Sequence, residues 1–119
     1  MDKARIQIQY GDTFGDNAGS TSINLPVWLE EAPLPKIKGF LKLAARHGNE
    51  YDNRGEIIRL EAYIAKAIAE AEAELEVAKA INEEGARKTE VRRVNNWINC
   101  LRKIQESLTA ALDKYYPKR

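Results

Sequence analysis

Apolar and polar residues alternate over two short segments near the N-terminus of this 119-residue chain. Between residues 4 and 10 the apolar positions are Ile6, Ile8 and Tyr10, and residues 21–25 repeat the same two-residue period. Such a period is typical of a strand with one buried face. The two segments therefore predict a β-hairpin within residues 1–25. Two strands alone are only marginally stable in water, so we expect a helix to cover the hairpin.

Residues 26–48 combine prolines with apolar residues at helical spacing, which predicts one or two short helices. The segment VWLEEA is bounded by prolines on both sides, and proline interrupts helical hydrogen bonding. From Pro35 a second helix is expected to run to the stop signal at Gly48. Residues 49–55 are interpreted as a linker. The buried side of the second helix comprises Ile37, Phe40, Leu41 and Ala44.

Residues 56–116 have the period of long helices, with one interruption at Gly85. We predict a first helix over residues 56–82 and a last helix that begins at or near Thr89 and ends at Tyr116. Two long helices joined by a short loop pack antiparallel, and burying their apolar seams supplies most of the stability. In the first helix the buried stripe is expected at Ile57, Leu60, Ile64, Ala67, Ile68, Ala71, Leu75, Ala78 and Ile81. In the last helix the seam is expected at Val91, Val94, Ile98, Leu101, Leu108 and Leu112, with Trp97 and Ile104 on its flank.

The helix over residues 56–82 also carries alanine on the face opposite its buried stripe, where a solvated helix usually has long polar side chains. These residues are Ala62, Ala65, Ala69, Ala73 and Ala80. Two explanations stay open: alanine is simply the strongest helix former, or the helix is sandwiched between two neighbours. In the second case the cover is another subunit, which predicts a homodimer, or the segment around Phe40 of the same chain.

The two long helices carry opposite charges, although the whole chain has a net charge of only +1. Between residues 60 and 84 there are seven glutamates and two lysines, whereas between residues 85 and 104 there are six basic residues and one glutamate. Opposite charges on adjacent helices favour their pairing, by about 0.2–1 kcal/mol for each exposed ion pair. The near-neutral total gives no electrostatic reason to expect nucleic acid, a membrane surface or an acidic substrate as partner.

No motif of a catalytic or cofactor-binding type occurs in the chain. The stretch GDTFGDNAGST, residues 11–21, lacks the lysine of a phosphate-binding loop and the final glutamate of a calcium loop, so we interpret it as an exposed turn. His47, the only histidine, lies at a predicted helix end, and Cys100, the only cysteine, borders the last seam. We therefore predict no enzyme activity, no cofactor and no metal site. The lone cysteine favours a reducing compartment such as the cytoplasm.

One polar stripe on the last helix has the composition of a binding surface. It consists of Arg92, Asn96, Asn99 and Lys103, opposite the apolar seam, with Arg93, Trp97 and Arg102 adjoining it. Cations next to side-chain amides contact acidic protein surfaces, or phosphates and base edges. Because Trp and Arg are enriched at the centres of protein interfaces, Trp97 and Arg93 are the candidate anchors. The remaining interpretation is that the stripe is only a solvated face.

These observations predict a single α+β domain, residues 1–119, that is mainly helical and binds a macromolecule without catalysis. We expect a small scaffold or inhibitor that acts through protein–protein contacts. Small phage or mobile-element inhibitors of host machinery, including anti-CRISPR proteins, fit that description as a class. The alternatives are a nucleic-acid-binding protein that uses the stripe of the last helix, and a self-assembling protein whose helices form a bundle between subunits. No segment approaches the roughly 18 apolar residues of a membrane span.

Overall fold

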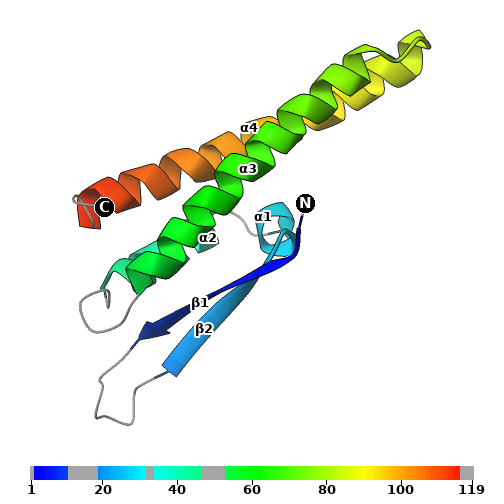
Figure 1. Ribbon diagram of the computed structural model, residues 1–119. Helices are drawn as coiled ribbons and strands as arrows, with labels where there is room; N and C mark the ends of the chain where they lie inside the picture. The colour runs from blue at the N-terminus through cyan, green and yellow to red at the C-terminus, as the bar shows by residue number, and fades with distance from the viewer. Residues whose placement is uncertain (1, 11–18, 32–33, 47–52, 116–119) are drawn as a thin grey trace.

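The structure of the protein, a computed structural model, describes residues 2–10, 19–31, 34–46 and 53–115. An antiparallel β-hairpin is followed by two short helices and then by two long ones (Figure 1). The fold is therefore α+β and mainly helical, as the sequence predicted. In chain order the elements are β1 (Ala4–Tyr10), β2 (Gly19–Leu25), α1 (Val27–Glu31), α2 (Leu34–Arg46), α3 (Asn53–Lys79) and α4 (Glu84–Tyr115).

The register of the hairpin places its large apolar residues on one face of the sheet. Ile6 lies opposite Ile23, and the polar Gln7 lies opposite Ser22. α2 and α3 lie against β1, and α1 lies against β2, so the predicted helical cover is present. The buried side chains of the hairpin are Ile6, Ile8, Ile23 and Leu25.

The glycine-rich stretch between the strands contributes to β2. Gly19 pairs with Tyr10, and Ser20 pairs with Gln9, so β2 begins two residues before the predicted segment. The rest of that stretch, residues 11–18, lies outside the described residues.

Two side chains at the start of α3 bond to the edge of β1 that faces away from β2. The side-chain amide of Asn53 accepts a hydrogen bond from Gln9 N–H (2.9 Å) and donates one to the Gln9 carbonyl (2.8 Å), as a residue of a third strand would. Asn53 Nδ2 also donates to the Ala44 carbonyl of α2 (3.1 Å). Glu56 accepts a hydrogen bond from Gln7 N–H (2.9 Å). Asn53, only 2% exposed, thus joins β1, α2 and α3. The helix α3 therefore begins at Asn53, three residues before the predicted position.

The contacts of Glu56 predict a loss of stability in acid. Burial raises the pKa of Glu56, but the hydrogen bond from Gln7 and the ion pair with Arg59 (2.7 Å) outweigh burial and lower that pKa below its ordinary value. A carboxylate with a lowered pKa stabilises the fold above its unfolded-state pKa, and the contribution is lost as the pH falls through the folded-state pKa. We therefore expect the wild type to be more stable than Glu56→Gln at neutral pH.

The free energies of unfolding of wild type and Glu56→Gln should converge as Glu56 becomes protonated. Urea unfolding between about pH 7 and about pH 2 would measure this convergence. Glu31→Gln, at an exposed carboxylate of α1, is the control and should show no comparable convergence. A difference between wild type and Glu56→Gln that stays constant over this range would contradict the prediction.

The short helices pack into the core as predicted. The buried residues of α2 are the four expected ones, Ile37, Phe40, Leu41 and Ala44. The Phe40 ring also contacts Trp28 of α1, with ring centroids 5.4 Å apart and planes tilted by 58°. This aromatic contact links the two short helices beneath the long ones.

α3 and α4 run antiparallel, and their facing sides form the centre of the core (Figure 1). The stripe predicted on this side of the first long helix is buried, except that Leu75 and Ile81 are half-buried. The seam predicted on α4 is buried as well, except for the half-buried Val91. Ile104, predicted on the flank, is only 2% exposed. α4 packs against α2 as well as α3, which widens its buried side beyond one seam.

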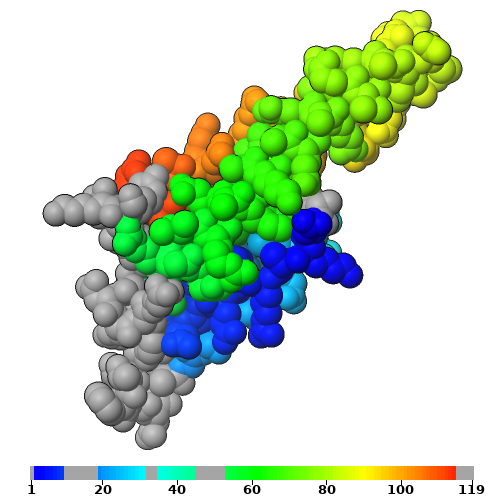
Figure 2. Space-filling view, viewed as in Figure 1, coloured from blue at the N-terminus to red at the C-terminus, as the bar shows by residue number. Residues whose placement is uncertain are grey.

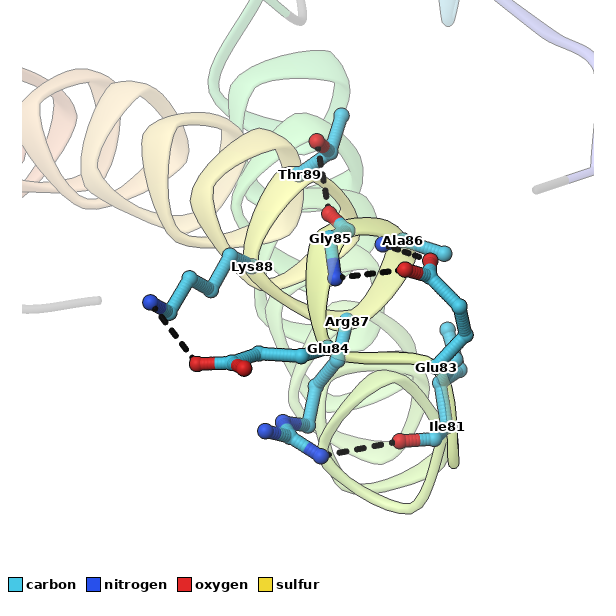
Figure 3. Close-up of polar contacts among 8 residues, drawn as sticks. All are labelled: Ile81, Glu83, Glu84, Gly85, Ala86, Arg87, Lys88 and Thr89. Atoms are coloured by element: carbon cyan, nitrogen blue, oxygen red, sulfur yellow. Dashed lines mark hydrogen bonds and ion pairs between the residues drawn. The ribbon is translucent and has the colours of Figure 1, made fainter.

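The predicted start of the last helix is wrong, because α4 begins at Glu84, five residues before Thr89. The Glu83 carboxylate accepts hydrogen bonds from the N–H groups of Gly85 (2.9 Å) and Ala86, which have no partner within the first helical turn (Figure 3). Thr89 instead donates its hydroxyl to the Gly85 carbonyl one turn back (3.0 Å). A Cβ atom on Gly85 would lie 3.1 Å from Glu83 Oε1, so glycine gives this cap its room.

The whole molecule measures 62 × 27 × 23 Å. The two long helices extend beyond its other elements (Figure 1). The hydrophobic core cluster ends at Ala71 on α3 and at Val94 on α4. Among residues 72–93, all of which are described, Ala78 alone is buried. We call residues 72–93 the arm, and Figure 2 shows it projecting from the body of the molecule.

On the side of α3 opposite the buried stripe, the alanines are exposed in the part of the chain that the structure describes. They are Ala62, Ala65, Ala69 and Ala73 of α3, together with Ala80 directly after it. The expectation that the segment around Phe40 covers them is wrong, because Phe40 packs in the core cluster with the stripe on the opposite side of α3. We call these five residues the alanine face.

Candidate protein-binding surface

The candidate site residues named from the sequence that the structure describes all lie on α4. In the described parts of the chain, no three His, Cys, Asp or Glu side chains form a group that could hold a metal ion. Cys100 is half-buried against the core, as predicted, while His47 lies outside the described residues. None of the helices that the structure describes has the length and apolar character needed to cross a membrane.

The stripe predicted on α4 is exposed, on the side of the helix opposite the buried seam. Arg92, Asn96, Asn99 and Lys103 all reach solvent, and their three- and four-residue spacing aligns them along one face. Within the described part of the chain, neither Arg92 nor Lys103 has an ion-pair partner, and neither asparagine makes a side-chain hydrogen bond. All four polar groups therefore remain available to a partner.

Two arginines beside the stripe are instead engaged across the helix pair. Arg93 bonds to Glu74 of α3 (2.5 Å) and to Glu90 of its own helix (3.1 Å). Arg102 bonds to Glu72 of α3 (3.0 Å). The predicted pairing between the acidic and the basic helix is thus confirmed at two positions.

The basic residues nearest the tip of the arm are also engaged. Lys88 pairs with Glu84 one turn earlier (3.0 Å), and Arg87 donates to the Ile81 carbonyl in the loop between the helices (3.3 Å) (Figure 3). The first contact lies within α4, and the second joins α4 to the loop that follows α3. They leave Arg92 and Lys103 as a distinct pair of cations on α4.

Arg93 contacts carboxylates of both long helices. Hydrogen bonds to Glu90 and then to Glu74 raise the pKa of the Arg93 guanidinium above its ordinary value. The same hydrogen bond from Arg93 lowers the pKa of Glu90. Arg93 would therefore enter an interface already paired, unlike Arg92 and Lys103.

A groove of about 520 Å³ lies beside the stripe, where α1, α3 and α4 meet. Trp97 is half-buried, packs against the core and contributes to the groove wall. Asn96 belongs to both the groove and the stripe. The groove is lined by Glu30, Glu74, Arg93, Asn96, Trp97 and Cys100. We call the stripe together with this groove the α4 surface.

Two groove residues could not be assigned from the sequence. Glu30 comes from α1 and Glu74 from α3, and both meet Trp97 only through tertiary packing. The one available signal was the acidic charge of residues 60–84, which predicted pairing with α4 but not a shared groove.

The α4 surface thus combines two unpaired cations, two amides and a half-buried tryptophan in a groove. Comparison of the chain with protein-family models, with curated proteins and with solved structures finds no match.

Proposed function

We propose that this chain is a non-enzymatic binding protein, a small scaffold or inhibitor, that recognises an acidic protein through its α4 surface. One observation carries the proposal: Arg92 and Lys103 are unpaired on one face, whereas Arg93 and Arg102 of the same helix are neutralised by α3. Arg93 and Arg102 contribute to the pairing of the two helices, whereas Arg92 and Lys103, on the side away from α3, take no part in it.

The spacing of these cations defines the complementary partner surface. Arg92 and Lys103 are eleven residues apart, which corresponds to about 16 Å along a helix. A partner with carboxylates at that separation would pair with both cations, and Asn96 and Asn99 between them would bond to polar groups. The groove beside Asn96 would receive one side chain against Trp97, in the manner of an interface anchor.

The carboxylates of the groove favour a protein over nucleic acid. Glu30 and Glu74 line the groove, and Glu90 lies one turn from Arg93. A phosphate backbone carries a charge at every nucleotide and would pass these carboxylates, and two cations neutralise few phosphates. An acidic protein can instead pair its carboxylates with Arg92 and Lys103 and place an uncharged side chain in the groove. A reducing interior such as the cytoplasm suits the half-buried free thiol of Cys100.

The test is reversal of the two unpaired charges. We expect Arg92→Glu with Lys103→Glu to raise the dissociation constant of the partner about 10- to 100-fold, or about 1.4–2.7 kcal/mol, without loss of thermal stability. The partner would be trapped from source-cell lysate by a photo-crosslinking residue at position 99, identified by mass spectrometry and then purified for titration. The matched control is Lys3→Glu with Lys36→Glu, which changes the net charge equally at exposed sites elsewhere.

Three outcomes would overturn the proposal. Capture that survives the double reversal would make the stripe a solvated face. Capture that nuclease abolishes, with affinity falling steeply as salt rises, would assign the surface to nucleic acid. Equal loss in the control variant would show that net charge, and not this surface, governs binding.

A further inference from the structure

We propose that a second groove, between α2 and the C-terminal part of α4, binds an acidic amphipathic helix of a partner protein. This groove has a volume of about 440 Å³ and is lined largely by apolar atoms of Leu41, Ala110 and Ala111. Leu41, only 4% exposed, belongs to the core cluster, so the groove opens directly onto the core. The groove shares no residue with the α4 surface, and the inference therefore stands without the proposed function.

The α4 wall of this groove has side chains small enough for a third helix to approach. Ser107, Ala110 and Ala111 are three and four residues apart, so they are neighbours on one side of α4. Helices whose contact consists of small side chains pack with axes as close as about 8 Å. A leucine of the third helix would lie between these residues and contact Leu41, as in other helix-in-groove interfaces.

The α2 wall supplies unpaired positive charge. α2 contains four basic residues and no acidic one, and two of the basic residues, Lys38 and Lys42, line the groove. Both are exposed, and neither has an ion-pair partner among the residues that the structure describes. Lys114 of the α4 wall already has a contact within its own chain. Lys38 and Lys42 are therefore the lysines of this groove that a partner can neutralise.

The spacing of these charges specifies the pattern of the partner helix. Lys38 and Lys42 are one helical turn apart, which corresponds to about 6 Å along α2. Two carboxylates four residues apart on the partner helix match this separation. Glu106 lies on the opposite wall, so a uniformly acidic helix would meet a like charge there. The complementary helix has glutamate or aspartate along the edge that faces α2, and lysine or arginine along the edge that faces Glu106.

A lipid surface fits this groove less well, although α2 is basic and amphipathic. Helices that bind membranes in this way insert their apolar face among the lipids. The apolar face of α2 is instead buried in the protein core, at Ile37, Phe40, Leu41 and Ala44. The apolar lining that remains lies between two helices, a shape that a third helix matches and a flat bilayer does not.

The test is titration with a synthetic peptide of about 14 residues, long enough to form a marginally stable helix. It carries leucine on one face, glutamate along one edge and lysine along the other. We expect it to shift the amide NMR signals of residues 38–42 and 106–114. A second peptide, with every glutamate replaced by lysine, should bind at least about 10-fold more weakly.

Reversal of the two lysines should exchange the preference between the peptides. We expect Lys38→Glu with Lys42→Glu to weaken binding of the glutamate peptide at least about 10-fold and to strengthen binding of the all-lysine peptide. Lys3→Glu with Lys36→Glu is the matched control, because it changes the net charge equally and Lys36 lies on α2 without lining the groove. The control should bind both peptides as the wild type does.

Filling the groove tests its shape independently of charge. Ala110→Trp should abolish peptide binding without changing the circular dichroism, because residue 110 is exposed in the single chain. Ala69→Trp, on the alanine face of α3, is the control and should leave binding intact.

Several results would overturn the proposal. They are unshifted signals at residues 38–42 and 106–114, equal binding of the two peptides, and binding that Ala110→Trp leaves intact. Binding to phosphatidylserine vesicles without binding to the glutamate peptide would assign the groove to a membrane surface. Self-association of the wild type in light scattering that Ala110→Trp abolishes would assign it to a second copy of this chain.

Discussion

Leu101→Ala is expected to lower the free energy of unfolding by about 2–5 kcal/mol, through lost burial and the cavity that the smaller side chain leaves. Leu101 is fully buried on α4 and belongs to the same core cluster as Ile64, which is fully buried on α3. A small domain is stable by only about 5–15 kcal/mol, so this one substitution removes a large share of the total. Urea unfolding followed by circular dichroism measures the change.

The control for this prediction is Val27→Ala, which shortens a hydrophobic side chain that is 49% exposed. Because little buried volume is lost, we expect a change below about 1 kcal/mol. If Leu101→Ala costs no more than Val27→Ala, Leu101 does not lie in the seam of the helix pair and the core is assembled differently.

Asn53→Ala should have the second large effect, because three polar groups lose their partners together. The N–H and carbonyl of Gln9 and the carbonyl of Ala44 all bond to the Asn53 side chain at 2.8–3.1 Å. A buried polar group left without a partner costs about 1–3 kcal/mol, and we expect a total of about 2–4 kcal/mol where water reaches some of these groups. Amide hydrogen exchange at Gln9 should also be faster in this variant than in the wild type.

Asn53→Asp separates the loss of hydrogen bonds from the loss of packing. Aspartate keeps the acceptor for Gln9 N–H, but its ionised form offers no donor and faces two carbonyl oxygens. We expect it to be at least as destabilising as alanine at neutral pH and to recover in acid, where the protonated carboxyl can donate. Asn95→Ala, at an exposed asparagine of α4, should change stability by less than about 0.5 kcal/mol. Equal stabilities of Asn53→Ala and Asn95→Ala would contradict the role assigned to Asn53.

Elements with a clear hydrophobic period were predictable from the sequence, and their ends were not. The buried side of α2 and the seam of α4 follow from helical spacing alone, because burial on one face dictates that spacing. The start of α4 was misplaced because capping is usually read from Ser, Thr, Asp or Asn, and here Glu83 supplies the carboxylate. Asn53 was assigned to a linker because its role depends on β1 and α2, which only the folded chain brings near it.

The candidate surface was likewise predictable only in part. The exposure of Arg92, Asn96, Asn99 and Lys103 was predictable, because all four lie opposite a seam that hydrophobic spacing defines. The pairing of Arg93 with Glu74, and the groove that they share with α1, depend on how separate helices cross. Side-chain spacing within one helix carries no information on such crossings, so the division of cations into paired and unpaired ones required the structure.

The Asn53 amide also has a consequence for aggregation. A strand at the edge of a sheet offers unpaired N–H and carbonyl groups on which another chain can add a strand. At Gln9 of β1 both groups are already occupied by Asn53, and at Gln7 the N–H is occupied by Glu56. The start of α3 therefore occupies three of the backbone groups through which another strand would add at this edge, and it hinders cross-β growth at Gln7 and Gln9.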